Sequence, residues 1–209
     1  MPPSDTPLET VFLLSPAHCG AKRSQLLFNE RAGFPLAVRL RHQGAPLGTV
    51  FSFLSGLYFR GKLAYARHFA RHDAAHGGVL VITPGWGLIP PEQNVTLDDL
   101  RAIAAVGVAP NEARFREPLE RDANVLAREL DSGGRVILLG SIATGKYVDI
   151  LERSLGERLL FPADFVGRGD MSRGGLMLRC AREDRELDYV PFAGAVRHGS
   201  RPPRLEPIR

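Results

Sequence analysis

The sequence predicts a single three-layer α/β domain with a mixed, mostly parallel β-sheet and a C-terminal antiparallel hairpin. Short apolar, β-branched runs at 10–15, 78–84 and 135–140 have the composition of buried strands. Segments with helical spacing separate these runs, which favours parallel pairing through crossover helices. Residues 175–181 and 186–192 flank a polar turn, as the two arms of a β-hairpin do.

The first half of the chain is expected to alternate between strands and helices. The first strand runs into a loop at 16–24, and a short helix is predicted over 34–44. Residues 49–55 alternate enough to indicate a strand or an extended connection. Residues 56–72 carry apolar side chains at three- and four-residue steps, which favours a helix.

In the second half, Thr96 and Asp99 form a capping-box pattern that predicts the start of a helix. Pro118 is expected in the first turn of the next helix, where its missing N–H costs nothing. A further helix is predicted over 146–156, followed by a strand and a turn over 158–165.

Composition places the chain among globular proteins. It has 209 residues, 44% apolar and 24% charged, and we divide it into a domain at 1–196 and a basic Pro- and Arg-rich tail at 197–209. No apolar run approaches the roughly 18 residues of a membrane span. The start of the chain has no basic segment before its first apolar run, and there are two cysteines. These features predict a cytoplasmic protein with no membrane partner.

The basic charge is carried almost entirely by arginine. The net charge is +4, with 24 arginines and three lysines, Lys22, Lys62 and Lys146. Arginine-rich composition can reflect a GC-rich genome, and each remaining lysine can also have a specific role. All three lie beside glycine or serine, in stretches typical of loops or of junctions between a loop and a helix. The charge is compatible with a nucleic-acid or phosphate partner.

Polar residues follow each predicted parallel strand, where ligands bind in open α/β sheets. Residues Lys22 and Arg23 follow the first strand, Trp86 follows the second, and Ser141, Thr144 and Lys146 follow the third. We expect these loops to converge on one crevice, with Lys22, Arg23, Ser141, Thr144 and Lys146 as ligand or phosphate contacts.

The stretch from Gly140 to Lys146 matches the pattern G-x-x-x-x-G-K of a phosphate-binding loop. However, Tyr147 occupies the position of the Ser or Thr that binds magnesium, and no later strand ends in a clear Walker-B aspartate. ATP hydrolysis is therefore not expected. The alternatives are a phosphate site without hydrolysis and a tight turn with a purely structural role.

The stretch 165–179 combines four glycines with three arginines and an aspartate. Arg168 and Arg173 could hold an anion, and Asp170 between them would stay ionised and act as an acid–base group. A structural turn with a buried Asp–Arg pair is the alternative. The spacing of His68, His72 and His76 suits metal ligands, but a solvated helix end explains it better, so we expect neither a metal nor another cofactor.

Three blocks resemble the YaaA-like family, which comprises the peroxide stress protein YaaA and related uncharacterised bacterial and phage proteins. The matching positions are Leu57–Arg60 in the first block, Gly87, Leu88 and Pro90 in the second, and Gly140 and Tyr147 in the third. The resemblance covers residues 10–155. It implies an α/β fold, a cytosolic setting and a partner related to nucleic acids.

Two functions are compatible with these features. The first is an enzyme that processes a nucleobase, a nucleotide or a nucleic acid, with Asp170 as the catalytic group and Tyr58 or Trp86 stacking on a base. The second is a non-catalytic DNA-binding or oxidative-stress-response protein that uses its arginine-rich surface and its basic tail.

Overall fold

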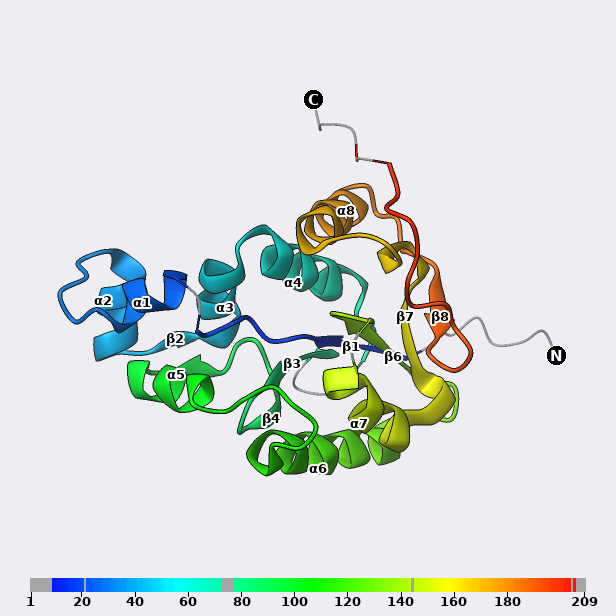
Figure 1. The fold of residues 1–209 in the computed structure, drawn as a ribbon, viewed down its shortest axis with the longest axis horizontal. Helices are drawn as coiled ribbons and strands as arrows, with labels where there is room; N and C mark the ends of the chain where they lie inside the picture. The colour runs from blue at the N-terminus through cyan, green and yellow to red at the C-terminus, as the bar shows by residue number, and fades with distance from the viewer. Residues whose placement is uncertain (1–8, 21, 73–76, 144, 204, 206–209) are drawn as a thin grey trace.

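A computed structural model describes residues 9–20, 22–72, 77–143, 145–203 and 205. A six-stranded sheet of order β4-β3-β1-β6-β7-β8 forms its centre (Figure 1). The four inner strands, β3, β1, β6 and β7, pair in parallel, and the edge strands β4 and β8 pair antiparallel. The strands are β1 (Thr10–Leu14), β3 (Val79–Thr83), β4 (Gly87–Ile89), β6 (Arg135–Leu139), β7 (Leu159–Pro162) and β8 (Tyr189–Pro191).

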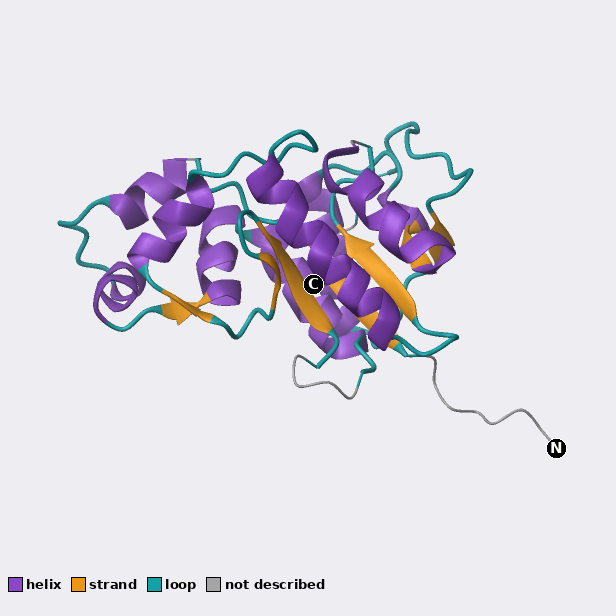
Figure 2. Cartoon of the chain, turned by 90° about the horizontal axis from the view of Figure 1, so that it is seen from below, coloured by secondary structure: helices purple, strands orange, loops and turns teal. Residues whose placement is uncertain are grey.

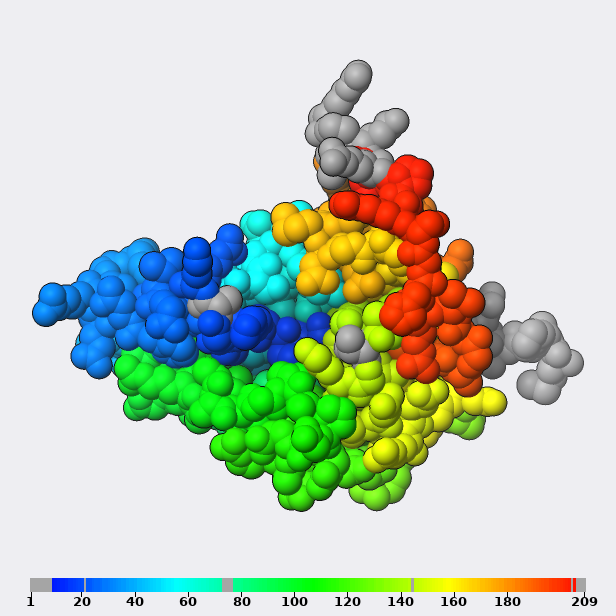
Figure 3. Space-filling view, in the orientation of Figure 1, coloured from blue at the N-terminus to red at the C-terminus, as the bar shows by residue number. Residues whose placement is uncertain are grey.

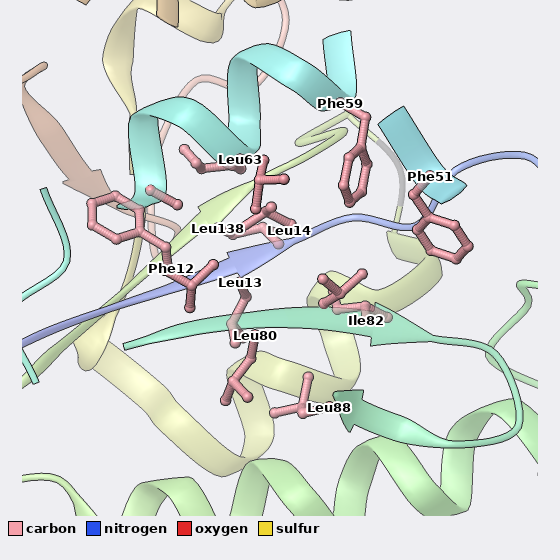
Figure 4. Packing of buried hydrophobic residues seen from close by; sticks show 14 of the residues in the cluster. Phe12, Leu13, Leu14, Phe51, Phe59, Leu63, Leu80, Ile82, Leu88 and Leu138 are labelled. Atoms are coloured by element: carbon pink, nitrogen blue, oxygen red, sulfur yellow. The ribbon is translucent and has the colours of Figure 1, made fainter. Parts of the chain in front are cut away.

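Helices cover both faces of the sheet, which completes the three predicted layers. The helices α4 (Leu57–Phe69) and α8 (Asp170–Arg182) lie on one face, and α6 (Ala113–Glu129) and α7 (Gly145–Leu155) lie on the other (Figure 1). Figure 4 shows Phe12 and Leu63 on the α4 side of the sheet, and Leu80 and Leu88 on the α6 side. Because helices cover both faces of the inner strands, the side chains on both faces are buried, and each strand is a continuous apolar run in the sequence.

A smaller group of helices extends from one end of the sheet (Figure 2). It consists of α1 (Lys22–Phe28), α2 (Pro35–His42), α3 (Leu47–Ser55) and α5 (Leu97–Ala104). The short strands β2 (Ala45–Pro46) and β5 (Asn94–Val95) pair antiparallel beneath them. The predicted capping box starts α5: Thr96 Oγ1 accepts from the Asp99 N–H at 3.2 Å, and Asp99 Oδ2 accepts from the Thr96 N–H at 2.8 Å.

The predictions for residues 49–55 and for the position of Pro118 are wrong. Residues 49–55, expected to be extended, lie in α3. Val50, Phe51 and Leu54 are buried there at helical spacing, and that spacing decides the outcome over the weak alternation. Pro118 lies inside α6 because this helix begins earlier, at Ala113, with Glu112 as its N-cap residue.

The C-terminal hairpin is confirmed only as an antiparallel edge strand. Its expected first arm, 175–181, belongs to α8, where Leu176, Met177 and Cys180 form a buried face. The second arm contains β8, which pairs with β7 through the register Phe161↔Val190. Along the chain, α8 therefore lies between β7 and its antiparallel partner β8, so a helix connects these two strands where a tight turn was expected.

The described part of the tail packs against the domain. The guanidinium of Arg197 lies 3.6 Å from a carboxylate oxygen of Glu152. The backbone at Ser200 lies against Gly167, whose φ of 71° and lack of a side chain allow that approach. Among the described residues, no helix is both long and apolar enough to cross a membrane.

Candidate functional site

The helices α4 and α8 cross with their backbones in contact at Gly61 and Gly174. A Cβ atom added to Gly61 would lie 2.5 Å from the carbonyl oxygen of Gly174. Side chains normally hold packed helices 8–10 Å apart, so two glycines are needed for this approach. The crossing sets Lys62, the neighbour of Gly61, and Arg173, the neighbour of Gly174, at the same edge of the sheet.

Lys62 is fully buried and points at the end of β1. Its Nζ donates to the carbonyl oxygen of Ser15 at 2.6 Å and contacts the Ser15 hydroxyl at 2.9 Å. The amine also lies 4.6 Å from the ring centre of Tyr58 and 4.7 Å from that of Phe59. Within the described chain, no carboxylate lies within 4.0 Å of this amine.

Burial lowers the pKa of Lys62 from 10.5 to about 7, and the negative charge of Asp170 opposes this shift. The cause is desolvation, because an apolar environment disfavours the charged form. An amine with a pKa near neutrality can both accept and donate a proton under physiological conditions, as an acid–base catalyst must.

The turn after β6 is closed by Tyr147. Its hydroxyl accepts the backbone N–H of Ser141 at 2.8 Å and is hydrogen-bonded to the side chain of Ser15. A Cβ at Gly140 would lie 2.8 Å from both the Cβ of Ser15 and the Tyr147 hydroxyl. Gly140 is therefore needed for close packing, and the tyrosine takes an amide that a phosphate-binding loop would present to its ligand.

Arg173 connects α8 to the same turn. Nη2 donates to the carbonyl oxygen of Phe165 at 2.8 Å, and Nη1 donates to that of Gly140 at 3.3 Å. The side chain is 9% exposed, and its Nη1 lies 4.0 Å from Oδ1 of Asp170, whose side chain is 69% exposed. The predicted Asp–Arg pair therefore exists, with the arginine buried and the carboxylate at the surface.

Tyr58 completes the arrangement from the first turn of α4. Its hydroxyl is buried and has no hydrogen bond of good geometry to a described residue. Burial raises the pKa of Tyr58, and the nearby guanidinium of Arg173 opposes that shift through its charge. Burial also raises the pKa of Tyr147. Both phenols therefore remain protonated at neutral pH and can act as hydrogen-bond donors.

We call these residues the strand-end cluster: Ser15, Tyr58, Lys62, Tyr147, Asp170 and Arg173. They come from β1 and its following loop, α4, α7 and α8. The cluster extends from the buried amine of Lys62 to the exposed carboxylate of Asp170. Figure 3 shows the loop after β1 in dark blue, the turn after β6 in yellow-green and the start of α8 in gold meeting on one face.

The other residues that the sequence predicted as ligand contacts are not part of the strand-end cluster. Lys22 and Lys146 are exposed in the first turns of α1 and α7. Arg23 is also exposed, and its Nη1 donates to the carbonyl oxygen of Phe53 at 3.1 Å. Trp86 is partly buried against the core, in the turn between β3 and β4.

Three more residues were predicted as ligand contacts: Ser141, Thr144 and Arg168. Ser141 gives its backbone amide to Tyr147. Arg168 donates from Nη1 to the hydroxyl of Ser172 at 3.3 Å and lies 3.9 Å from the carboxylate of Asp164. Arg168 therefore lies just before α8, beside the outer face of this helix, whereas Arg173 faces the sheet. Thr144 lies outside the described residues.

Sequence reasoning placed Ser15 at the end of the first strand, but it assigned a role at the site to neither Ser15 nor Lys62. It placed Lys62 beside a loop, whereas this lysine lies within α4 on its buried face. Two signals could have identified it. Lysine persists there in a chain that otherwise uses arginine, and position 62 follows the buried Tyr58 by four residues, so both lie on one helix face.

His68 and His72 each lie close to a different carboxylate. Nε2 of His68 lies 2.8 Å from Asp184, and Nε2 of His72 lies 3.0 Å from Glu9. His76 lies outside the described residues. Within the described ranges, no three His, Cys, Asp or Glu side chains are grouped so that they could hold a metal ion.

No family model, curated protein sequence or solved structure matches this chain. The function is therefore argued from the geometry of the strand-end cluster and from the sequence.

Proposed function

We propose that this protein is an enzyme that processes a nucleobase, a nucleotide or a nucleic acid at the strand-end cluster. The observation that carries the proposal is the 2.9 Å contact between the Lys62 amine and the Ser15 hydroxyl. A serine beside a lysine of lowered pKa is a known arrangement for activating a hydroxyl nucleophile.

The proposed chemistry follows from the ionisation of the cluster. In its unprotonated form, the Lys62 amine accepts the proton of the Ser15 hydroxyl as the oxygen attacks an electrophilic centre of the substrate. The protonated amine then gives that proton to the leaving group as its bond to the centre breaks. Water, deprotonated by the same amine, then displaces Ser15 from the adduct and restores its hydroxyl. The phenols of Tyr58 and Tyr147 donate hydrogen bonds to negative charge that develops in the transition state.

The nucleotide class is supported by charge and by position. Arg173 supplies a guanidinium at the C-terminal edge of the parallel strands, where α/β proteins bind such ligands. Asp170 offers an exposed carboxylate that can accept hydrogen bonds from base or sugar groups. The resemblance of three sequence blocks to YaaA-like proteins supports the same class.

The alternative, a non-catalytic DNA-binding or stress-response protein, has weaker support. It relies on a surface rich in arginine, but among the residues that the structure describes at least twelve arginines have a carboxylate within 4.0 Å. These pairs reduce the positive field on which non-specific DNA binding depends. DNA binding on an arginine-rich surface also does not explain the buried contact between Lys62 and Ser15.

A ligand screen by thermal shift tests the proposal. Nucleobases, nucleosides, nucleotides and short oligonucleotides are added to the wild type and to Asp170→Asn, Lys146→Ala and Arg153→Gln. We expect one class to raise Tm in the wild type, less in Asp170→Asn, and fully in Arg153→Gln, which changes an exposed arginine on α7. Lys146→Ala shows whether that lysine contacts the phosphate. No stabilisation by any class would contradict the proposal.

The state of Lys62 can be measured directly because the chain has only three lysines. NMR of protein labelled with ¹³C at the lysine Cε should give three signals. The signal that disappears in Lys62→Met should titrate near pH 7. A Lys62 signal that stays protonated up to pH 9 would rule out the amine as a base for Ser15.

A further inference from the structure

A cavity of about 550 Å³ lies on the outer side of α8, away from the strand-end cluster. The helix forms one wall, and residues 201–203 and 205 of the C-terminal segment form the other. Figure 3 shows this segment, in red, running beside α8, in gold. Leu57, Leu178 and Leu205 give the cavity an apolar lining. Its size lies within the range of ~300–1,000 Å³ that is typical of small-molecule sites.

The charged side chains that the described residues contribute to this cavity are all positive. Arg168, Arg179 and Arg201 line it, and no aspartate or glutamate is among the described residues that do so. Three guanidinium groups around one apolar space repel one another. The arrangement is complementary to an anion, and more so to a dianion than to a single charge.

Of the three arginines, Arg168 gives the strongest evidence for an anion site. Its side chain is 11% exposed, and its Nε is buried without a hydrogen-bond partner in the described part of the chain. Its Nη1 donates a long hydrogen bond of 3.3 Å to the Ser172 hydroxyl, and its nearest carboxylate contact, to Asp164, is 3.9 Å long, with the side chain of Asp164 44% exposed. A buried cation with so little compensation is costly, and an anion in the cavity would remove that cost.

The cavity and the strand-end cluster occupy opposite faces of α8. Arg173 faces the sheet and bonds to the turn after β6, whereas Ser172, Gly175 and Arg179 line the cavity. Helical periodicity separates the two sets, since residues 172, 175 and 179 share one face and residue 173 lies on another. A ligand in the cavity would therefore not compete with a substrate at the cluster.

We propose that this cavity binds an organic phosphate of the size of a nucleoside monophosphate. Its phosphate is held by Arg168 and Arg201, and its body lies on Leu57, Leu178 and Leu205. This site is independent of the chemistry proposed for Ser15 and Lys62.

Calorimetric titration with AMP, inorganic phosphate and decanoate tests this site. We expect AMP to bind more tightly than phosphate alone, which lacks the body, and more tightly than decanoate, which carries one charge. Arg168→Gln and Arg201→Gln should each weaken AMP binding at least tenfold. Arg182→Gln, which removes an exposed arginine at the end of α8, should change it less than twofold.

Gly175→Leu provides a variant that blocks the cavity without removing charge. A Cβ there meets only Leu205 Cδ1 within 4 Å, at 3.7 Å, so the leucine fits by filling the cavity. AMP binding should be lost in this variant and retained in Ser15→Ala, which disables the cluster alone. AMP affinities within twofold of the wild type in Arg168→Gln and Gly175→Leu, or a preference for decanoate, would overturn the proposal.

Discussion

The Cα atom of Tyr58 lies 2.8 Å from the position that a Cβ of Gly174 would occupy. The first turn of α4 therefore rests directly on the backbone of α8. This contact holds Tyr58 and Lys62 on one side of the crossing and Arg173 on the other. The strand-end cluster depends on a pair of helices that tolerates no side chain at their contact.

Gly174→Ala should therefore destabilise the protein by ~2 kcal/mol or more, because the added methyl group must push the two helices apart. Its neighbour Gly175 is the matched control, since a Cβ there has space. Gly175→Ala should be neutral or stabilising by up to ~1 kcal/mol, as expected from helix propensity. Urea unfolding measures both. Equal free energies of unfolding for the two variants would show that the crossing is not tight.

The buried Lys62 should make stability depend on pH in an unusual direction. Its pKa is 10.5 in the reference state and about 7 in the fold, so between these values the unfolded chain binds more protons. Stability then rises with pH across this window, by at most ~1.4 kcal/mol per pH unit. Below pH 7 both states are protonated and this dependence ends.

Lys62→Met isolates this contribution, because all other titrating groups are shared with the wild type. The free energy of unfolding is measured in urea between pH 6 and pH 9 for both proteins. We expect the difference between them to change above pH 7 and to be constant below it. A difference that is constant over the whole range would mean that Lys62 does not lose its proton in the fold.

Restoring the phosphate-loop pattern should not create an ATP site. Tyr147→Ser completes the motif G-x-x-x-x-G-K-S, but the turn around Gly140 is packed against Ser15. We expect no Mg-ATP binding in a calorimetric titration of either the wild type or this variant. Binding in the variant alone would show that Tyr147 is the sole obstacle.

Tyr147→Phe tests the hydroxyl that closes the turn. The ring stays in the core, but the Ser141 amide and the Ser15 side chain each lose a partner. The loss should cost ~1–2 kcal/mol, as expected for one buried hydrogen bond with an unsatisfied partner. Thermal or urea unfolding gives the value, and an unchanged stability would mean that water replaces the phenol.

The capping box of α5 provides a test far from the cluster. Thr96→Ala removes the acceptor for the Asp99 N–H and should cost ~1 kcal/mol. Asp98→Asn, on the same helix turn, removes only an exposed pair with Arg101 and should cost ~0.5 kcal/mol or less. Urea unfolding of both variants compares them, and the reverse order would argue against the box as the stabilising feature.

Local sequence patterns correctly predicted the elements that are stabilised by interactions between residues close together in the sequence. The apolar runs at β1, β3 and β6, the spacing of α4 and the cap at Thr96 each have a nearby physical cause, and all were predicted. The convergence of loops at one sheet edge also followed, because parallel strands end on the same side. Segments with weak patterns, such as 49–55 and 175–181, were predicted wrongly, since tertiary burial selected the helix there.

The strand-end cluster could be anticipated only in part. Asp170, Arg173, Tyr58 and the turn at Gly140 were singled out from composition and motif. The contact of Lys62 with Ser15 was not, because 47 residues separate them and their meeting depends on how α4 lies over β1. The sequence by itself determined an α/β sheet with polar loops at one edge. Only the tertiary structure decided which side chains meet there, since two glycines in separate helices must first bring the backbones into contact.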